Sequence, residues 1–241
     1  DPTADVEGLD AARKIAILSS IAFNSRITLD DVYVEGITSI TPADIKYARE
    51  LGYVIKLLAI AKEDEEGRIQ ARVHPAFLPL SHPLAVVNDV FNAVFVRGDA
   101  VGEIMHFGRG AGKMPTASAV VGDIIEIGRN LLSQSNARIG CTCYESKTIL
   151  GIQELQAKYY VRMTVEDRPG VLAGIAGVFG NNRVSIATVL QKTSEAGMAE
   201  LILITHKVRE QDLRDSLTVL KGKSIVGTIN NVIRLEGSEA E

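Results

Sequence analysis

The pair Asp10 and Lys14 offers the clearest possibility for chemistry in this sequence. The two residues stand four apart in Gly-Leu-Asp-Ala-Ala-Arg-Lys, residues 8–14. Four residues make about one helical turn, so the acid and the amine project from one side of a helix. A buried helix face with one carboxylate and one ammonium could move a proton to or from a small polar substrate. The same spacing also fits an ordinary surface salt bridge, and the pair alone does not decide between the two interpretations.

Two glycine-bearing segments could bind ligands through their backbone. Residues 108–112, Gly-Arg-Gly-Ala-Gly, precede a predicted helix at 116–132, and backbone N–H groups at a helix start can bind anions. A tight turn with close packing is the alternative interpretation. Residues 166–172, Glu-Asp-Arg-Pro-Gly-Val-Leu, end a predicted strand and open a helix. Here proline fixes the turn, and glycine lets N–H groups face a ligand carboxylate.

The first half of the chain alternates helical and extended patterns around these segments. Apolar periodicity predicts a helix over 9–23, and Thr41-Pro-Ala-Asp is a strong start for a second helix that ends near residue 51. Residues 30–36 and 37–41 are predicted to be extended. Two hairpins are expected, from residues 53–62 with 68–75 and from residues 91–97 with 101–107. These elements predict an α+β domain, a mixed sheet with helices on one face, over residues 1–132.

The second half shows a different rhythm, typical of a ferredoxin-like βαββαβ unit. Strands are expected at 159–166, 186–193, 198–206 and 224–235, and helices at 171–181 and 209–220. We expect this domain to span residues 158–236, after a linker at 133–157 that contains a short helix near residues 152–156. Residues 236–241 are expected to form a polar tail.

Composition excludes several classes of function. The net charge is −4, so the chain has no basic surface of the kind that binds nucleic acid. No apolar stretch reaches membrane-spanning length. Cys141 and Cys143 lack a second pair, and the four histidines are scattered, so we expect reduced cytoplasmic thiols and no metal site. The dipeptides at His74 and His82, each followed by proline, are expected in turns.

Three segments resemble those of the homoserine dehydrogenase family in its long bacterial form. Residues 8–14 are similar to the family signature G-x-D-x-x-x-K, and residues 108–123 are similar to a second family block. Residues 166–172 resemble the opening of an ACT domain, an amino-acid-sensing module. The family begins with an NAD(P)-binding Rossmann domain, and no G-x-G-x-x-G motif follows a strand near residue 1. The resemblance therefore implies a substrate and dimerisation domain followed by an ACT domain, in a fragment that we expect to be inactive alone.

The resemblance also implies roles for individual residues. The family interconverts L-homoserine and L-aspartate 4-semialdehyde with NAD or NADP, in the biosynthesis of threonine, methionine and isoleucine. Lys14 and Asp10 would be catalytic and bind substrate, and Asp5 would help to bind the substrate amino group. Gly110, Ala111 and Gly112 would pass close to the nicotinamide. Threonine would be the effector, and the residues expected to bind it are Asp167, Gly170, Val171, Leu172, Asn181 and Asn182.

Other interpretations stay open at this stage. The chain could be a non-catalytic amino-acid-binding regulator in which Asp10 and Lys14 are only structural. It could belong to another ACT-bearing enzyme such as aspartate kinase, although the glycine block with its Pro-Thr-Ala-Ser continuation, residues 115–118, speaks against this. The ACT domain itself could serve only dimerisation. A homo-oligomer, dimer or tetramer, is expected in each case, and neither nucleic acid nor membrane is an expected partner.

Overall fold

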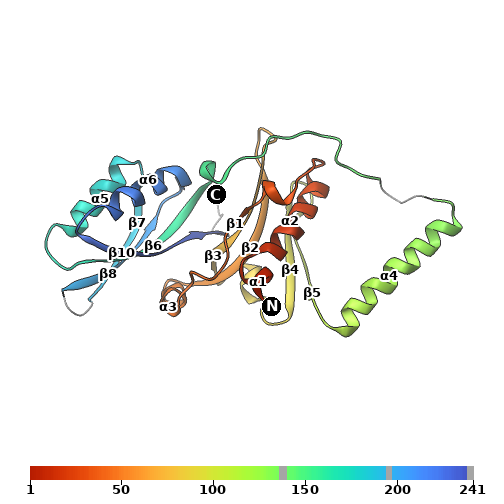
Figure 1. Ribbon diagram of the computed structural model, residues 1–241, viewed down its shortest axis with the longest axis horizontal. Helices are drawn as coiled ribbons and strands as arrows, with labels where there is room; N and C mark the ends of the chain where they lie inside the picture. Colours follow the sequence, from red (N-terminus) through yellow and green to blue (C-terminus); the bar gives the residue numbers. More distant parts are fainter. Residues whose placement is uncertain (136–139, 194–196, 238–241) are drawn as a thin grey trace.

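A computed structural model describes residues 1–135, 140–193 and 197–237 of the chain (Figure 1). One sheet of eight strands crosses most of the molecule in the order β1-β3-β10-β6-β8-β7, with β2 on β3 and β9 on β6. A separate two-stranded hairpin is formed by β4 and β5. The strands are β1 (Tyr33–Val34), β2 (Tyr53–Glu63), β3 (Ile69–Pro79), β4 (Phe91–Gly98), β5 (Gly102–Arg109), β6 (Gln156–Glu166), β7 (Ile186–Thr193), β8 (Met198–Thr205), β9 (Val208–Arg209) and β10 (Val226–Leu235).

The first unit packs helix α2 (Leu9–Ala22) onto β2 and β3, after the short helix α1 (Thr3–Val6). Ala12 and Ala16 are buried against Val73 and its neighbours on β3. Their small side chains let the helix lie close to the sheet. The predicted helix over 9–23 is therefore confirmed to within one residue, and its buried face is the alanine face.

Helix α3 (Pro42–Glu50) begins where the sequence predicts. The Thr41 hydroxyl accepts a hydrogen bond from the Asp44 backbone N–H, and the Asp44 carboxylate accepts one from the Thr41 backbone N–H at 3.0 Å, which completes a capping box. The helix buries Tyr47 in a cluster that includes Phe77 of β3 and Tyr160 of β6. The rings of Phe77 and Tyr160 stack at 4.6 Å between centroids. Helix α3 thus packs against strands from both halves of the chain.

The second unit has the predicted βαββαβ order, with α5 (Val171–Asn181) and α6 (Glu210–Lys221) between its strands. Both helices cover one face of β6, β7, β8 and β10 (Figure 1). Alternate residues of β6, Tyr159, Val161 and Met163, belong to the core under these helices. Tyr160 faces the other way, toward α3. This unit is therefore covered by its own helices on one side and by a helix of the first unit on the other.

The two units share one sheet, which the sequence did not predict. Strand β10 pairs with β6 on one side and, in parallel, with β3 on the other, where Arg234 lies opposite Ala76 and Leu235 opposite Phe77. Residues 148–150 of the predicted linker also form backbone hydrogen bonds with the first unit. The Ile69 N–H donates to the Thr148 carbonyl and the Leu150 N–H to the Ile69 carbonyl, both at 2.8 Å. The short helix predicted near 152–156 is the 3-10 helix η3 (Ile152–Glu154).

Two local predictions were wrong. Residues 37–41 form a turn rather than a strand, in which the Ile40 N–H donates to the Ile37 carbonyl at 3.0 Å. His74 lies in the middle of β3 and is fully buried, not in a turn. His82 does lie in a turn, before the 3-10 helix η2 (Pro83–Val86). A further 3-10 helix, η1 (Leu29–Asp31), occupies part of the segment predicted to be extended.

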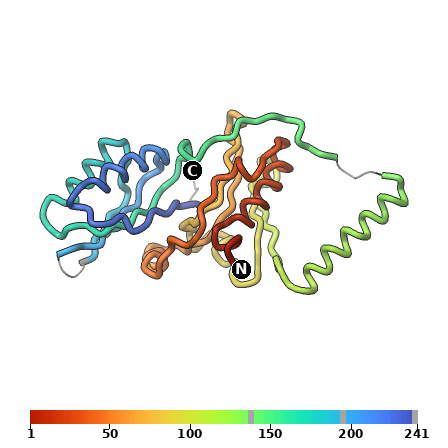
Figure 2. Tube along the Cα trace, in the orientation of Figure 1, coloured from red at the N-terminus to blue at the C-terminus, as the bar shows by residue number. Residues whose placement is uncertain are grey.

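Helix α4 (Lys113–Leu132) stands apart from the rest of the molecule (Figure 2). It begins three residues before the predicted start, directly after Gly112. None of its residues is buried, and its exposed apolar side chains are Met114, Val120, Val121, Ile124, Ile125, Ile127, Leu131 and Leu132. An exposed apolar surface therefore runs along this helix. No helix among the described residues is long and apolar enough to span a membrane.

Candidate functional site

Asp10 and Lys14 form an ion pair on α2. The Lys14 Nζ lies 2.6 Å from Asp10 Oδ2, and the side chains are 66% and 42% exposed, respectively. The predicted pairing is confirmed, but the pair lies on an open surface of this chain rather than on a buried face. An exposed pair at this spacing contributes only about 0.3–0.5 kcal/mol to stability. The fold therefore does not depend on it, and both groups are accessible to a small molecule.

The turn between α1 and α2 places Asp5 and Asp10 on either side of Gly8. Gly8 has a φ of 80°, and a Cβ there would lie 3.0 Å from the Val73 side chain. Only glycine meets both conditions without strain. Asp5 is part of α1, and its carbonyl accepts a hydrogen bond from the Gly8 N–H at 3.1 Å. The three charged residues predicted to bind substrate therefore all lie on α1 and α2, on either side of the Gly8 turn.

A second segment crosses directly over this turn. A Cβ at Gly36 would lie 2.6 Å from the Val6 carbonyl oxygen and 2.7 Å from the Glu7 Cα. The Ile37 N–H donates to the Val6 carbonyl at 2.9 Å. No side chain fits at Gly36, because two backbones touch there. This contact fixes the segment that carries Asp5 and Asp10 against the end of β1.

Gly110, Ala111 and Gly112 belong to a different element, the junction of β5 and α4. A Cβ at Gly110 would lie 1.9 Å from the Asn92 amide nitrogen, and Gly112 has a φ of 127°. All three residues are exposed. The glycines are thus required by local packing and backbone conformation, and they leave an open stretch of main chain that a flat ligand could approach.

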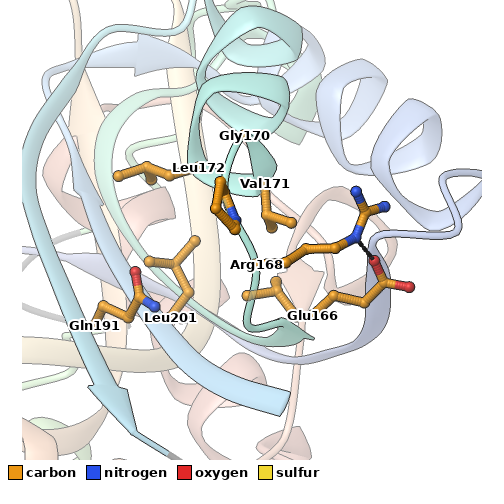
Figure 3. Close-up of a pocket in the computed structure, with 9 residues that line it drawn as sticks. Glu166, Arg168, Gly170, Val171, Leu172, Gln191 and Leu201 are labelled. Atoms are coloured by element: carbon orange, nitrogen blue, oxygen red, sulfur yellow. Dashed lines mark hydrogen bonds and ion pairs between the residues drawn. The ribbon is translucent and has the colours of Figure 1, made fainter. Parts of the chain in front are cut away.

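The second unit contains a cavity of about 180 Å³ at the start of α5 (Figure 3). Gly170, Val171 and Leu172, three of the residues expected to bind an effector, line it together with Glu166, Arg168 and Gln191 among others. Gly170 has a φ of 89° and precedes the first helical residue. An anion in this cavity would find backbone N–H groups of a helix start and one guanidinium.

The polar side chains around this cavity are already linked to one another. Arg168 Nε lies 2.5 Å from Glu166 Oε2, and Gln191 Nε2 donates to Asp167 Oδ1 at 3.2 Å. Gln191 comes from β7, and no local pattern in the sequence marks it as a cavity residue. Asn181 and Asn182 lie at the other end of α5, about 15 Å away by helical rise. Asn182 Nδ2 donates to the Val178 carbonyl at 2.8 Å and so closes the helix end.

Sequence reasoning missed two buried ion pairs, one that joins the units and one inside the second unit. Asp44 of α3 is fully buried and accepts hydrogen bonds from Arg162 Nε of β6 at 2.8 Å and from Asn231 Nδ2 of β10 at 2.9 Å. Arg234 of β10 contacts Glu210 of α6, with its Nε at 2.9 Å and its Nη2 at 2.7 Å. Asp44 carries a signal only as part of the Thr41-Pro-Ala-Asp helix start. No local pattern indicates the ion pairs themselves, because the partners lie far apart in the sequence.

These ion pairs shift the titration of their members. Burial raises the pKa of Asp44, but hydrogen bonds from Arg162, Asn231 and Thr41 outweigh burial and leave the pKa below its usual value. Burial likewise raises the pKa of Glu210, and the Arg234 guanidinium more than offsets this, so the net shift is again downward. Both carboxylates are therefore charged at neutral pH. Asp44 joins the two units through Arg162, whereas Glu210 pairs with Arg234 inside the second unit.

The fold and the site together define a class of protein: a mixed-sheet substrate unit with an accessible carboxylate–ammonium pair, joined to a regulatory unit of the ACT type. The sequence model of the ACT domain matches residues 159–223, and that of homoserine dehydrogenase matches residues 1–125. The chain belongs to the homoserine dehydrogenase family.

Individual relatives agree with this assignment. The homoserine dehydrogenase of Corynebacterium glutamicum is 49% identical over 240 residues, which are 98% of this chain and 54% of that protein. That of Bacillus subtilis is 40% identical over 99% of this chain and 55% of its own length. The crystal structure of a homoserine dehydrogenase from Thiobacillus denitrificans superposes with a TM-score of 0.90 at 38% identity, covering 98% of this chain and 55% of that one. The chain thus spans about half the length of the relatives it matches.

Proposed function

We propose that this chain is the substrate-binding and regulatory portion of an NAD(P)-dependent homoserine dehydrogenase, which interconverts L-homoserine and L-aspartate 4-semialdehyde. The observation that carries the proposal is the Asp10–Lys14 ion pair, exposed on a helix inside the segment that matches the family. The activity belongs to the longer protein, since the matching relatives are about twice as long. The products would serve the synthesis of threonine, methionine and isoleucine.

The pair suits the proton transfer that this reaction needs. When the aldehyde is reduced, its oxygen gains negative charge, and an ammonium within hydrogen-bond distance can stabilise that charge and supply the proton. Lys14 would take this role. Asp10, 2.6 Å from Lys14 Nζ, would orient the ammonium and accept a hydrogen bond from the substrate hydroxyl. Asp5, on the other side of the Gly8 turn, would bind the substrate amino group.

The dinucleotide would approach the open main chain of Gly110, Ala111 and Gly112. These residues fit such a ligand because they are exposed and two of them carry no side chain. When bound, NAD or NADP supplies the hydride donor or acceptor for the reaction. The role of this chain is then to place a smooth segment of backbone beside the nicotinamide and to hold the substrate from α1 and α2.

The second unit would sense an amino acid, with threonine as the expected effector. The cavity at the start of α5 is lined by Arg168, Gly170 and Leu172, whose guanidinium and backbone N–H groups could bind a carboxylate. Asp167 and Glu166 lie beside it and could bind an ammonium group. Asn181 and Asn182 would contribute only through a second binding surface, such as that of a partner ACT domain in a dimer or tetramer.

The test is homoserine oxidation by the full-length enzyme, followed as reduced nicotinamide absorbance. Lys14→Ala should lower kcat by about 10²–10⁴-fold, because the proton-transfer group is lost. The melting temperature should stay within about 1 °C, since an exposed pair stabilises little. Arg13→Ala, which removes the neighbouring exposed cation of the same helix, is the matched control and should keep full activity.

Near-normal turnover of Lys14→Ala would remove this residue from the mechanism. Absence of homoserine oxidation by the wild-type enzyme with either nicotinamide would refute the dehydrogenase proposal as a whole. The same assay with threonine added tests the sensing role, and rates that do not respond would refute threonine as effector.

A further inference from the structure

Glu35 contacts the second unit one residue before Gly36, which touches the proposed substrate segment. Its Oε2 accepts hydrogen bonds from Arg234 Nη1 at 2.7 Å and from the Tyr33 hydroxyl at 3.0 Å. Arg234 is only 6% exposed and is also bound by Glu210 of α6. The Glu35 carboxylate is therefore attached to a side chain that the second unit holds rigidly from the opposite side.

The backbone on either side of Glu35 supports the turn between α1 and α2. The Glu35 N–H donates to the Val73 carbonyl at 2.8 Å. The next residue, Gly36, touches the backbone of Val6 and Glu7, and the Ile37 N–H donates to the Val6 carbonyl. A displacement of residues 35–37 therefore moves the turn that carries the two proposed substrate-binding carboxylates.

Strand β10 connects this contact with the cavity of the second unit. Near its start, the Ile225 carbonyl accepts a hydrogen bond from the N–H of Glu166, a cavity residue, at 3.0 Å, and Val226 pairs with Val165. Near its end, Arg234 binds Glu35. The eight residue steps between Val226 and Arg234 span about 25 Å. One continuous strand thus touches both the cavity and the support of the substrate segment.

We propose that Glu35 is a positioning residue that couples the two units: through Arg234 it fixes the α1–α2 turn, and through β10 the occupancy of the second unit's cavity alters the affinity for substrate. The inference rests on the proposed function, and it states through which residues the effector would regulate substrate binding. Linkage makes the coupling reciprocal, so homoserine should change the affinity for the amino-acid effector by the same factor.

The first test is kinetic and uses the full-length enzyme with Glu35→Gln. Arg234 keeps Glu210 as its counter-charge in this variant, so the fold should be retained. The KM for homoserine should rise by about fivefold, with kcat within about twofold, and threonine should no longer change that KM. The control is Glu50→Gln, which breaks another contact between the units, Glu50 with Lys192 of β7, in which both side chains are about one-third exposed. Glu50→Gln should change neither the KM for homoserine nor the response of that KM to threonine.

The second test needs no activity. Amide hydrogen exchange of residues 4–12 should be faster in Glu35→Gln than in the wild type or in Glu50→Gln, in this 241-residue chain. If Glu35→Gln does not fold, Tyr33→Phe, which removes only one of the two donors to Glu35, should show the same changes to a smaller degree. Equal KM and equal exchange in the Glu35 and Glu50 variants would overturn the proposal.

The two levels of inference fail in different ways. A wild-type enzyme without homoserine oxidation would refute the proposed function, while the exchange experiment would still decide whether Glu35 supports the α1–α2 turn. A wild-type enzyme that oxidises homoserine but ignores threonine would refute the effector, and the KM of the Glu35 variant would still decide the positioning role.

Discussion

Acidification from about pH 7 to pH 5 should destabilise this protein through one buried histidine. His74 is fully buried in β3, where its Nδ1–H donates to the Pro75 carbonyl at 3.0 Å and its Nε2 accepts from Arg72 Nε at 3.2 Å. The bond from Arg72 requires a neutral ring, because a protonated Nε2 has no lone pair with which to accept it. Burial first, and then the Arg234 and Arg72 guanidinium groups, hold the pKa of His74 well below its usual value.

One nearby carboxylate does not reverse this shift. Glu236 Oε1 lies 3.6 Å from His74 Nε2 and would favour a protonated ring. The same oxygen is bound by Arg72 Nη2 at 2.7 Å, so its charge is already neutralised by a closer cation. We therefore expect His74 to stay neutral in the folded protein at pH 5.

The magnitude follows from linkage. In the unfolded chain the ring titrates near its ordinary pKa of about 6.5, so at lower pH the unfolded state binds a proton that the folded state does not. For one such group the free energy of unfolding falls by about 2 kcal/mol between pH 7 and pH 5. Asp44 and Glu210 contribute little in this window. Their pKa values are lowered in the folded state, so the stability they add is present above pH of about 4 and is lost only as the pH falls further.

The assay is urea unfolding at several pH values between about 7 and 5, followed by far-ultraviolet circular dichroism, because the chain contains no tryptophan. The amide of His74→Gln can replace one donor and one acceptor of the ring. The free energy of unfolding of this variant should therefore fall by about 2 kcal/mol less than that of the wild type between pH 7 and pH 5. His206→Gln, at an exposed histidine, should follow the wild type. Identical pH dependence of the wild type and His74→Gln would refute the assignment of a neutral buried ring.

Three further predictions concern the interface between the units and two of the glycines. Asp44→Asn should lower the free energy of unfolding by about 3 kcal/mol in urea titrations, because it removes the fully buried carboxylate that pairs with Arg162 and leaves only the partly exposed Glu200 as its counter-charge. Glu50→Gln, at an exposed pair, should lower the free energy of unfolding far less, and equal losses in the two variants would contradict the reasoning. Gly36→Ala should reduce stability, since two backbones leave no room for a Cβ. Gly122→Ala, with open space around it in α4, should instead slow amide exchange of that helix by up to about fivefold, corresponding to about 1 kcal/mol of helix propensity.

Sequence patterns predicted the elements whose signals are local. The Thr41-Pro-Ala-Asp start of α3 and the βαββαβ order of the second unit are confirmed. The Asp10–Lys14 pair was predicted from spacing alone, and its exposure agrees with the surface salt bridge rather than with the buried face that the spacing also allowed. In each case the signal lies within one or two turns of chain, where periodicity and capping act directly.

His74 shows why other features could not be predicted. Proline after a histidine usually indicates a turn, yet Pro75 lies inside β3. The Val73 and Phe77 carbonyls accept from the backbone N–H groups of Glu35 and Glu236, so Pro75 faces the gap between two partner strands. No ladder hydrogen bond is needed there, and the missing N–H costs nothing. A proline is allowed inside β3 because of how distant strands pair with it, and no local sequence pattern indicates that pairing.

The position of β10 between β6 and β3 also has a consequence for anyone who divides this chain. A cut before β6 would not release two finished domains. The first piece would expose the edge of β3 together with the side of α3 that packs on Tyr160, and the second would expose the opposite edge of β10. Open edges beside apolar surface invite pairing with other chains. Either half expressed alone should therefore self-associate, and a soluble regulatory module would need α3, or a replacement for it, to travel with the second unit.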